Sequence, residues 1–259
     1  TFTQNVAGTD GGALANGGLA TVYACTINEN GATNGGGGGI FNLAGSTANI
    51  TNSTLTTNVA ELGGGIYNVG TMTLTNDTLS GSTANVGGGG LYIASGAVKL
   101  RNSIVAGNIA PSDSDVFGTP FETYNNLVAG DPKLGSLANN GGPTLTMLPL
   151  AGSPVLDEGN NLFTVESFAG IDFNGDGDTL DTLTTDQRGT GFTRTLGSIV
   201  DIGSIEVPAS CPAFPYTVPA GETKALIIAV DCAGKTPADD VIELTNSTYT
   251  LTSSNNMGE

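Results

Sequence analysis

The stretch GGGIYN at residues 63–68 decides the fold of this chain, because related blocks recur at a fixed spacing. These blocks are GGALAN at residues 11–16, GGGIFN at 37–42 and GGGLYI at 88–93. Each glycine run leads into one aliphatic residue, and these residues are 26, 26 and 25 positions apart: Leu14, Ile40, Ile66 and Leu91. Self-similarity at one period is the signature of a repeat architecture.

Within each repeat, apolar residues alternate with Thr, Ser or Asn, as in TMTLT at residues 71–75. A period of two is that of a β-strand. Short strands joined by glycine-rich corners, with one coil per repeat, form a parallel β-solenoid. We therefore predict an all-β fold, a right-handed parallel β-helix with three short strands in each coil of about 25 residues.

Stacking places equivalent residues of successive coils above one another. The aliphatic residues then form an internal ladder, and the column Asn16, Asn42 and Asn68 is expected to hydrogen-bond along the stack. The glycine blocks supply a positive φ at the corners. A second marker, an aliphatic residue followed three positions later by Asn, recurs at Ile27 and Leu55.

The glycine blocks and the aliphatic-x-x-Asn motif resemble repeats of polymorphic outer-membrane and autotransporter-like β-helix proteins. A second group of motifs comprises DPKLG (131–135), NGGPTLT (140–146), GSPVLD (152–157), DQRG (186–189) and DIGSIE (201–206). It resembles the choice-of-anchor Q domain of large bacterial surface proteins. The resemblance covers about residues 45–206 and implies a place at the cell surface, with no agreed catalytic residues.

Three regions follow from these patterns. Residues 1–130 are the β-helix coils, of which the fifth lacks a glycine block, and residues 131–206 are a loop-rich closing region. Residues 207–259 are a Pro-rich linker and the start of a following β-helix module, so that the chain is expected to be a piece of a longer protein or array. Cys211 and Cys232 could form a disulfide there, whereas Cys25 is expected to be a buried small residue of the first coil.

The composition excludes several function classes. The 259 residues include no His, which excludes Ser-His-Asp triads, Cys-His dyads and His-ligated zinc. Seven bases face 24 acids, for a net charge of −17, and this argues against a nucleic-acid partner. No apolar run approaches the length of a membrane span.

The acidic stretch DFNGDGDTLD at residues 172–181 is a candidate Ca²⁺ loop. Oxygen ligands alternate and a glycine follows at the sixth position, as in the first half of an EF-hand loop. The twelfth position is Leu183 where that pattern has Glu. The candidate ligands are Asp172, Asn174, Asp176, Asp178 and Asp181, and a solvated acidic loop is the alternative.

Two further sets of residues are singled out by their spacing. Phe41, Tyr67 and Tyr92 each follow an inward aliphatic residue and are expected to stack on the outside, either to contact a glycan or a neighbouring molecule, or only to stiffen the coils. In the closing region we expect structural ion pairs among Arg188, Arg194, Asp201 and Glu206. Acids outnumber bases 24 to 7 in this chain, so each Arg is expected to meet a carboxylate.

We expect an extracellular, cell-surface structural protein, a subunit or fragment of a bacterial fibre, sheath or filament whose copies assemble head to tail, and no enzyme. The alternative is a carbohydrate-binding adhesin that uses the aromatic column. A polysaccharide lyase or glycosidase is the third reading, for which Asp113 and Asp115 are the best carboxylate pair.

Overall fold

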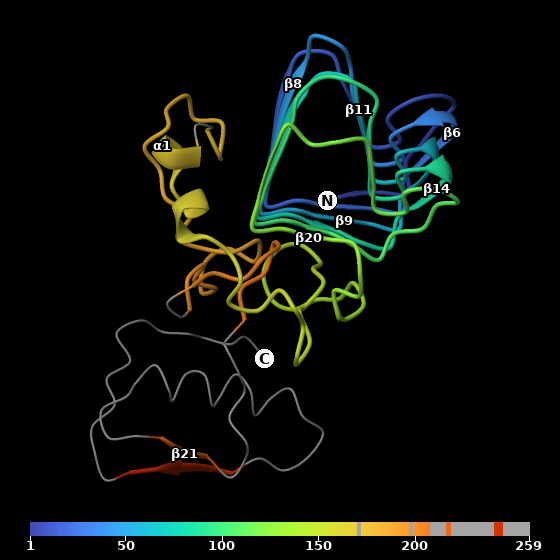
Figure 1. Ribbon diagram of the computed structural model, residues 1–259. Helices are drawn as coiled ribbons and strands as arrows, with labels where there is room; N and C mark the ends of the chain where they lie inside the picture. Colours follow the sequence, from blue (N-terminus) through green and yellow to red (C-terminus); the bar gives the residue numbers. More distant parts are fainter. Residues whose placement is uncertain (170–171, 197–198, 208–215, 219–240, 246–259) are drawn as a thin grey trace. The chain divides into compact units, whose positions relative to one another are not determined.

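The computed structural model describes residues 1–169, 172–196, 199–207, 216–218 and 241–245. The chain divides into two compact units, Thr1–Val207 and Pro208–Glu259. The first unit is a parallel β-helix, as the repeat predicts, and its coils appear as superposed outlines in Figure 1. Register partners in one of its sheets, such as Ile40 and Ile66, are 25 or 26 residues apart.

Four parallel sheets run along the stack. Sheet A contains β1 (Phe2–Thr3), β5 (Thr26–Asn28), β9 (Thr54–Thr56), β13 (Thr78–Leu79), β17 (Ile104–Val105) and β20 (Leu127–Val128). Sheet B contains β2 (Val6–Ala7), β6 (Gly31–Gly36), β10 (Val59–Leu62) and β14 (Thr83–Gly87). Sheet C contains β3 (Leu14–Asn16), β7 (Ile40–Asn42), β11 (Ile66–Asn68), β15 (Leu91–Ile93) and β18 (Val116–Phe117). Sheet D contains β4 (Leu19–Tyr23), β8 (Thr47–Thr51), β12 (Thr71–Thr75), β16 (Val98–Arg101) and β19 (Glu122–Tyr124).

The expectation of three strands per coil is wrong, because the structure has four. The strand that the sequence hides belongs to sheet B, where β6 has the sequence GATNGG, with Thr33 as its single β-branched residue and no aromatic residue. Its last two residues belong to the glycine run that the pattern assigns to a corner. Main-chain pairing with the coils above and below holds this segment extended.

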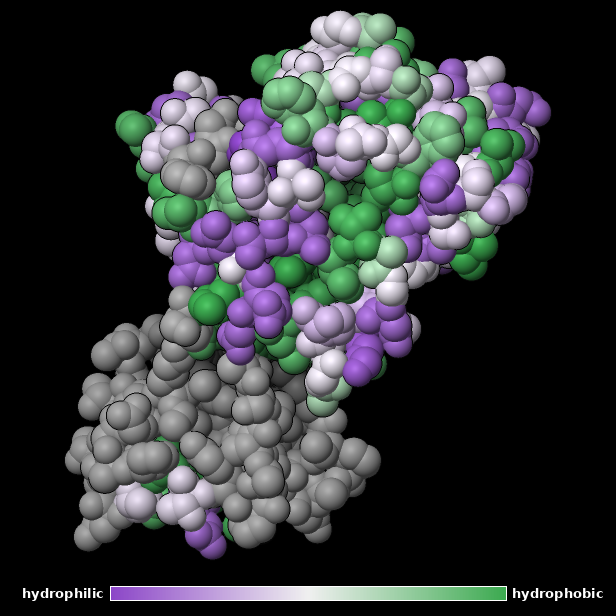
Figure 2. Space-filling view, viewed as in Figure 1, coloured by the Kyte–Doolittle hydropathy of each residue, from purple (hydrophilic) through white to green (hydrophobic). Residues whose placement is uncertain are grey.

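The interior of the coils is a set of aliphatic ladders. Ile40, Ile66 and Leu91 are fully buried, and so are the equivalent residues of sheet D, Ile50 and Leu74. In Figure 2, hydrophobic residues gather toward the middle of the coils, whereas hydrophilic and hydrophobic residues are mixed along the rim. Each buried side chain of this size contributes about 1.5–3 kcal/mol by leaving water, so the stack is stabilised coil by coil.

In the blocks that begin at residues 37, 63 and 88, the three glycines have different tasks. The first, such as Gly63, has a positive φ of 63°, as the sequence predicts for a corner. The second and third lie against the next coil: a Cβ on Gly38 would be 2.5 Å from the carbonyl oxygen of Gly64, and one on Gly39 would be 2.7 Å from that of Gly65. A side chain on Gly38 or Gly39 would therefore push the backbone of the next coil away.

Polar ladders run beside the aliphatic ones. The amide Nδ2 of Asn16 donates to Asn42 Oδ1, and that of Asn42 donates to Asn68 Oδ1, both at 2.8 Å, which confirms the predicted Asn column. In a second ladder the backbone N–H of Asn30 donates to Asn58 Oδ1 at 3.0 Å. The same bond recurs in the other coils from Asn5 to Asp115, with Ser82 replacing Asn once.

The closing region lies along the outside of the coils. Thr26, Thr54 and Thr78 form an outward column of sheet A, yet all three are buried, because residues of the closing region cover them. The side chain of Gln187 bonds Thr26 and Thr54, and Ser204 bonds Thr54 and Thr78. The region has a single 3₁₀ turn, η1 (Asn161–Thr164), and the short helix α1 (Glu166–Ala169) among its described residues.

The second unit is described at two strands. Strand β21 (Tyr216–Val218) pairs in parallel with β22 (Ile242–Leu244). Across both units, the described residues include no helix long and apolar enough to span a membrane.

Candidate functional site

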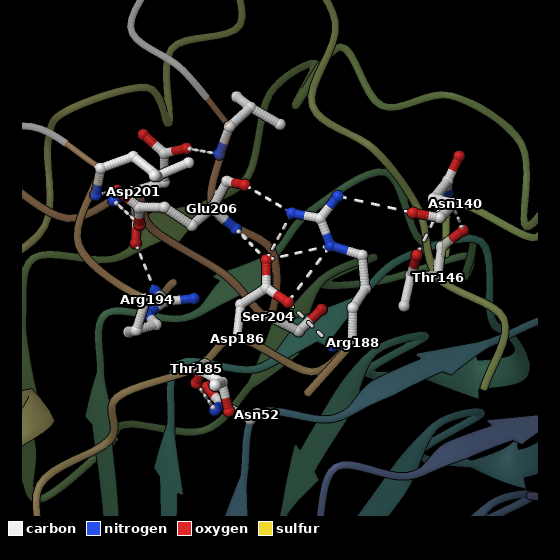
Figure 3. A network of polar contacts seen from close by, with 12 residues as sticks. Asn52, Asn140, Thr146, Thr185, Asp186, Arg188, Arg194, Asp201, Ser204 and Glu206 are labelled. Carbon is white, nitrogen blue, oxygen red and sulfur yellow. Dashed lines mark hydrogen bonds and ion pairs between the residues drawn. The ribbon is translucent and has the colours of Figure 1, made fainter. Parts of the chain in front are cut away.

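The charged residues of the segments DQRG (186–189) and DIGSIE (201–206) come together with Arg194 in one buried network (Figure 3). Asp186, Arg188, Arg194, Asp201 and Glu206 are each at most 6% exposed. They belong to irregular segments of the closing region, which hydrogen bonds to the coils hold in place. Burial of five charged side chains is costly unless each has polar partners, so the partners of these groups show what the network does.

Arg188 forms an ion pair, as expected, but its partner is Asp186, which was not among the expected partners. Its Nη2 is 2.6 Å from Asp186 Oδ2 and its Nε donates to the same carboxylate. The guanidinium also donates to the carbonyl oxygen of Glu206 at 2.7 Å and lies 4.0 Å from the ring centroid of Phe192. Its donors are thus directed at groups of the closing region itself.

Arg194 behaves differently from the expectation. It is fully buried, and its Nη2 donates to the side-chain oxygen of Asn76 at 3.1 Å and to the carbonyl oxygen of Asp201 at 2.7 Å. Within the described part of the chain, Arg194 has no carboxylate within ion-pair distance, and its Nε and Nη1 have no hydrogen-bond acceptor. The pairing predicted for Arg194 is not formed there, because the nearby carboxylates are directed at backbone N–H groups.

Asp201 and Glu206 are those carboxylates. Asp201 accepts from the backbone N–H of Asp157 at 2.7 Å and of Val207 at 2.8 Å, and Glu206 accepts from the N–H of Leu196 and Asp201. Burial raises the pKa of Asp201 to about 6 and that of Glu206 to about 7, although Arg194 lowers both. These two carboxyl groups hold the loop backbone in place, and they lose their protons between mildly acidic and neutral pH.

Asp77 is a further buried acid, located in the coils, and the sequence analysis misses it. Its carboxylate accepts from the backbone N–H of Ser53 at 2.8 Å and of Thr75 at 2.9 Å. Burial raises the pKa of Asp77 well above its ordinary value, while these two hydrogen bonds and the charge of Arg194 lower it. Asp77 occupies the ladder position that Ser53 and Ser103 hold in neighbouring coils. An Asp where the other coils have Ser is the feature of the sequence by which this buried acid could have been predicted.

Side chains at the coil corners also attach the closing region to the coils. Asn52, Asn76 and Asn102 have positive φ values, and each donates its side-chain amide to a backbone oxygen of the closing region. The acceptors are Thr185, Phe163 and Asn160, the first at 3.0 Å and the last at 2.9 Å. A repeated Asn thus turns the corner and binds a non-repeating partner. Repetition in the sequence indicates only the first of these tasks.

The acidic loop is built from bonds within itself. Asp172 accepts from the backbone N–H of Gly175 and Gly177, and Asn174 Nδ2 donates to Asp181 Oδ2 at 2.7 Å. Desolvation raises the pKa of Asp172, but backbone N–H groups of the loop, those of Gly177 and Gly175 first among them, together lower it below its ordinary value. In the described residues, no three His, Cys, Asp or Glu side chains are grouped so that they could hold a metal, and calcium at this loop stays a prediction of the sequence.

A cleft of about 340 Å³ lies between this loop and the coils. Tyr23 of β4, Phe173 and Leu183 form its apolar part, and Glu166 lies in its wall. Glu166 is fully buried and accepts from the backbone N–H of Phe173 and of Asp181, so it anchors both ends of the acidic loop. Burial raises the pKa of Tyr23. The carboxylate of Glu166 is thus engaged in holding the loop.

The aromatic column is formed as expected, and it is one residue longer. Phe41, Tyr67, Tyr92 and Phe117 stack with centroid distances of 5.0, 5.1 and 4.2 Å and interplanar angles of at most 10°. The sequence analysis misses Phe117 because the fifth coil has lost the glycine block that marks the phase. Since each ring covers the face of the next, mainly ring edges are directed outward.

The remaining candidates are quickly placed. Asp115 accepts hydrogen bonds from Asn108 and so ends a ladder. Cys25 is partly exposed, has a free thiol and packs against the core, while Cys211 and Cys232 lie outside the described residues.

Comparison of the chain with protein-family models, curated proteins and solved structures finds no match. The resemblance to the choice-of-anchor Q domain therefore stays a prediction.

Proposed function

We propose that this chain is an extracellular structural protein, a building block of a surface fibre, sheath or filament whose copies join head to tail. The observation that carries the proposal is the unbroken stack of four parallel sheets in the first unit, with aliphatic, polar and aromatic ladders running along it. Such a stack resists bending because every coil is bonded to its neighbours over most of its length.

The network around Arg188 and Arg194 supports a mechanical role. Its donors and acceptors are directed at backbone groups of the closing region and at corner side chains of the coils. A site that transforms a substrate needs a nucleophile or acid facing accessible space, whereas Asp186 and Glu206 are at most 1% exposed. We infer that the network fixes the closing region along the coils and stiffens the rod.

The aromatic column gives less support to the adhesin alternative. A sugar ring stacks on an aromatic face, and in this column the faces of Tyr67 and Tyr92 are covered by neighbouring rings. The stacked rings are therefore better explained as a feature that stiffens the coils along one side.

Electron microscopy of the protein isolated from its source tests the proposal. Long filaments with a regular axial repeat are the expected result, and they would make each chain one unit of the repeat. Separate short rods at all protein concentrations would contradict it. Binding of those rods to a glycan array, lost in a Tyr67→Ala variant, would favour the adhesin.

A further inference from the structure

The cleft between the acidic loop and sheet D has a buried charge in its wall. Glu166 is fully buried, and its carboxylate accepts one backbone N–H at each oxygen, from Phe173 and from Asp181. Among the described residues, no Lys or Arg lies within ion-pair distance of Glu166. A buried carboxylate without a cation is costly, so this wall favours a positively charged occupant.

The surroundings of Glu166 add negative charge. Asp181 also lines the cleft, and the described lining residues include no Lys or Arg. On the side of the coils, residues 1–98 contain no base. Burial is the main reason that the pKa of Tyr23 is raised, and the charges of Asp181 and Glu166 raise it further, as expected if both carboxylates face the phenol across the cleft.

Polar atoms of sheet D beside the cleft lack partners. Thr51 is the register partner of Tyr23 on the neighbouring strand, and Thr75 follows on the next. Both Thr side chains are buried, and neither hydroxyl has a hydrogen-bond partner among the described residues. The same holds for Asn52 Oδ1. Buried polar atoms are nearly always hydrogen-bonded, so these oxygens indicate an occupant with N–H or O–H groups on this side of the cleft.

The cleft also has an apolar part. The ring of Tyr23 packs with Phe173 and Leu183, which are both buried. An aromatic ring attracts both a cation and an alkyl chain. A volume of about 340 Å³ is within the range of small-ligand sites.

We propose that this cleft binds a small organic ammonium ion, whose N–H groups donate to Glu166 and Asp181 while its alkyl chain lies against the ring of Tyr23. Each carboxylate oxygen has two lone pairs, so Glu166 can accept from an ammonium group and still hold the backbone of the acidic loop. Hydrogen bonds between two charged groups are the strong ones. The proposal is independent of filament formation.

Saturation-transfer NMR of the full-length chain tests the site, with butylammonium chloride as the probe and butanol as its neutral counterpart. Glu166→Gln removes the buried charge and keeps an acceptor oxygen. Thr182→Lys, at an exposed residue of the lining, places a tethered ammonium group in the cleft. The matched control is Asp178→Asn, which removes one charge of the loop at a residue outside the lining.

We expect wild-type protein and Asp178→Asn to bind butylammonium saturably and to bind no butanol. Binding should be weaker by at least about tenfold in Glu166→Gln, which loses a charge-assisted contact, and absent in Thr182→Lys. Circular dichroism checks the fold of each variant. If Glu166→Gln fails to fold, Thr182→Lys alone decides, because its exposed site tolerates the substitution.

Three results would overturn the proposal: no saturable binding by the wild type, equal binding of butanol, or unchanged affinity in Thr182→Lys. Binding of CaCl₂ that Thr182→Lys abolishes, without any binding of butylammonium, would overturn it too and would make the cleft a metal site. A primary ammonium group belongs both to free amines and to lysine side chains. Titration with Nα-acetyl-lysinamide distinguishes the two sources, because tighter binding than that of butylammonium assigns the site to a lysine side chain and weaker binding assigns it to a free amine.

Discussion

Substitution of Asn42 by Ala measures how much the polar ladders stabilise the coils. Asn42 is fully buried; its Nδ2 donates to Asn68 Oδ1 at 2.8 Å and to the carbonyl oxygen of Thr71 at 2.9 Å, and its Oδ1 accepts from Asn16 at 2.8 Å. Three hydrogen bonds are lost, each worth about 1 kcal/mol net, and buried partners are left with fewer bonds. We expect the free energy of unfolding to fall by about 3–5 kcal/mol.

The assay is guanidinium-induced unfolding followed by circular dichroism, with Asn34→Ala as the control. Asn34 is exposed and donates one bond of 3.2 Å to the carbonyl oxygen of Gly8, so its loss should change the free energy of unfolding by less than about 0.5 kcal/mol. An Asn42→Ala variant that loses no more than this control would refute the view that the internal Asn column holds the coils together.

Four further outcomes are expected. Burial raises the pKa of Asp201 to about 6 and that of Glu206 to about 7, so the native state binds more protons than the unfolded state between about pH 4 and 7. The free energy of unfolding should therefore fall by a few kcal/mol as the pH rises through this range. In pH-dependent denaturation, the Asp201→Asn, Glu206→Gln double variant should show a flatter profile than the wild type. Arg188→Ala leaves the carboxylate of Asp186 buried without its partner and should lower the free energy of unfolding by about 3–5 kcal/mol, whereas an unchanged value would contradict the structural role. Calorimetric titration with millimolar CaCl₂ should give a binding heat that Asp176→Ala removes, and no heat in the wild type would eliminate the calcium prediction. Tyr67→Ala removes two ring contacts and should destabilise the coils by about 1–3 kcal/mol in the same unfolding assay, and an unaltered stability would show that stacking does not stiffen them.

Regular features of this fold are predictable because a coil repeats its environment. The spacing of Ile40, Ile66 and Leu91 places them in one ladder, and the structure has them as register partners. The same spacing predicts the Asn column and the stacking of Tyr67 on Tyr92. In each case one physical situation, burial between identical neighbours, selects the same type of residue in every coil.

Features without a repeat could not be found in this way. The strands of sheet B are held by main-chain pairing, so GATNGG shows no strand pattern. The side-by-side packing of the closing region depends on single bonds such as those of Gln187 with Thr26 and Thr54, which leave no periodic trace. Arg194 lacks the expected ion pair in the described structure because backbone N–H groups engage the carboxylates around it.

Cryo-electron microscopy of the assembled protein, at a resolution that separates strands, tests the central claim most directly. The account predicts filaments in which a strand spacing of about 4.8 Å continues from one copy into the next. Separate rods, or rods that associate only side by side, would contradict the account.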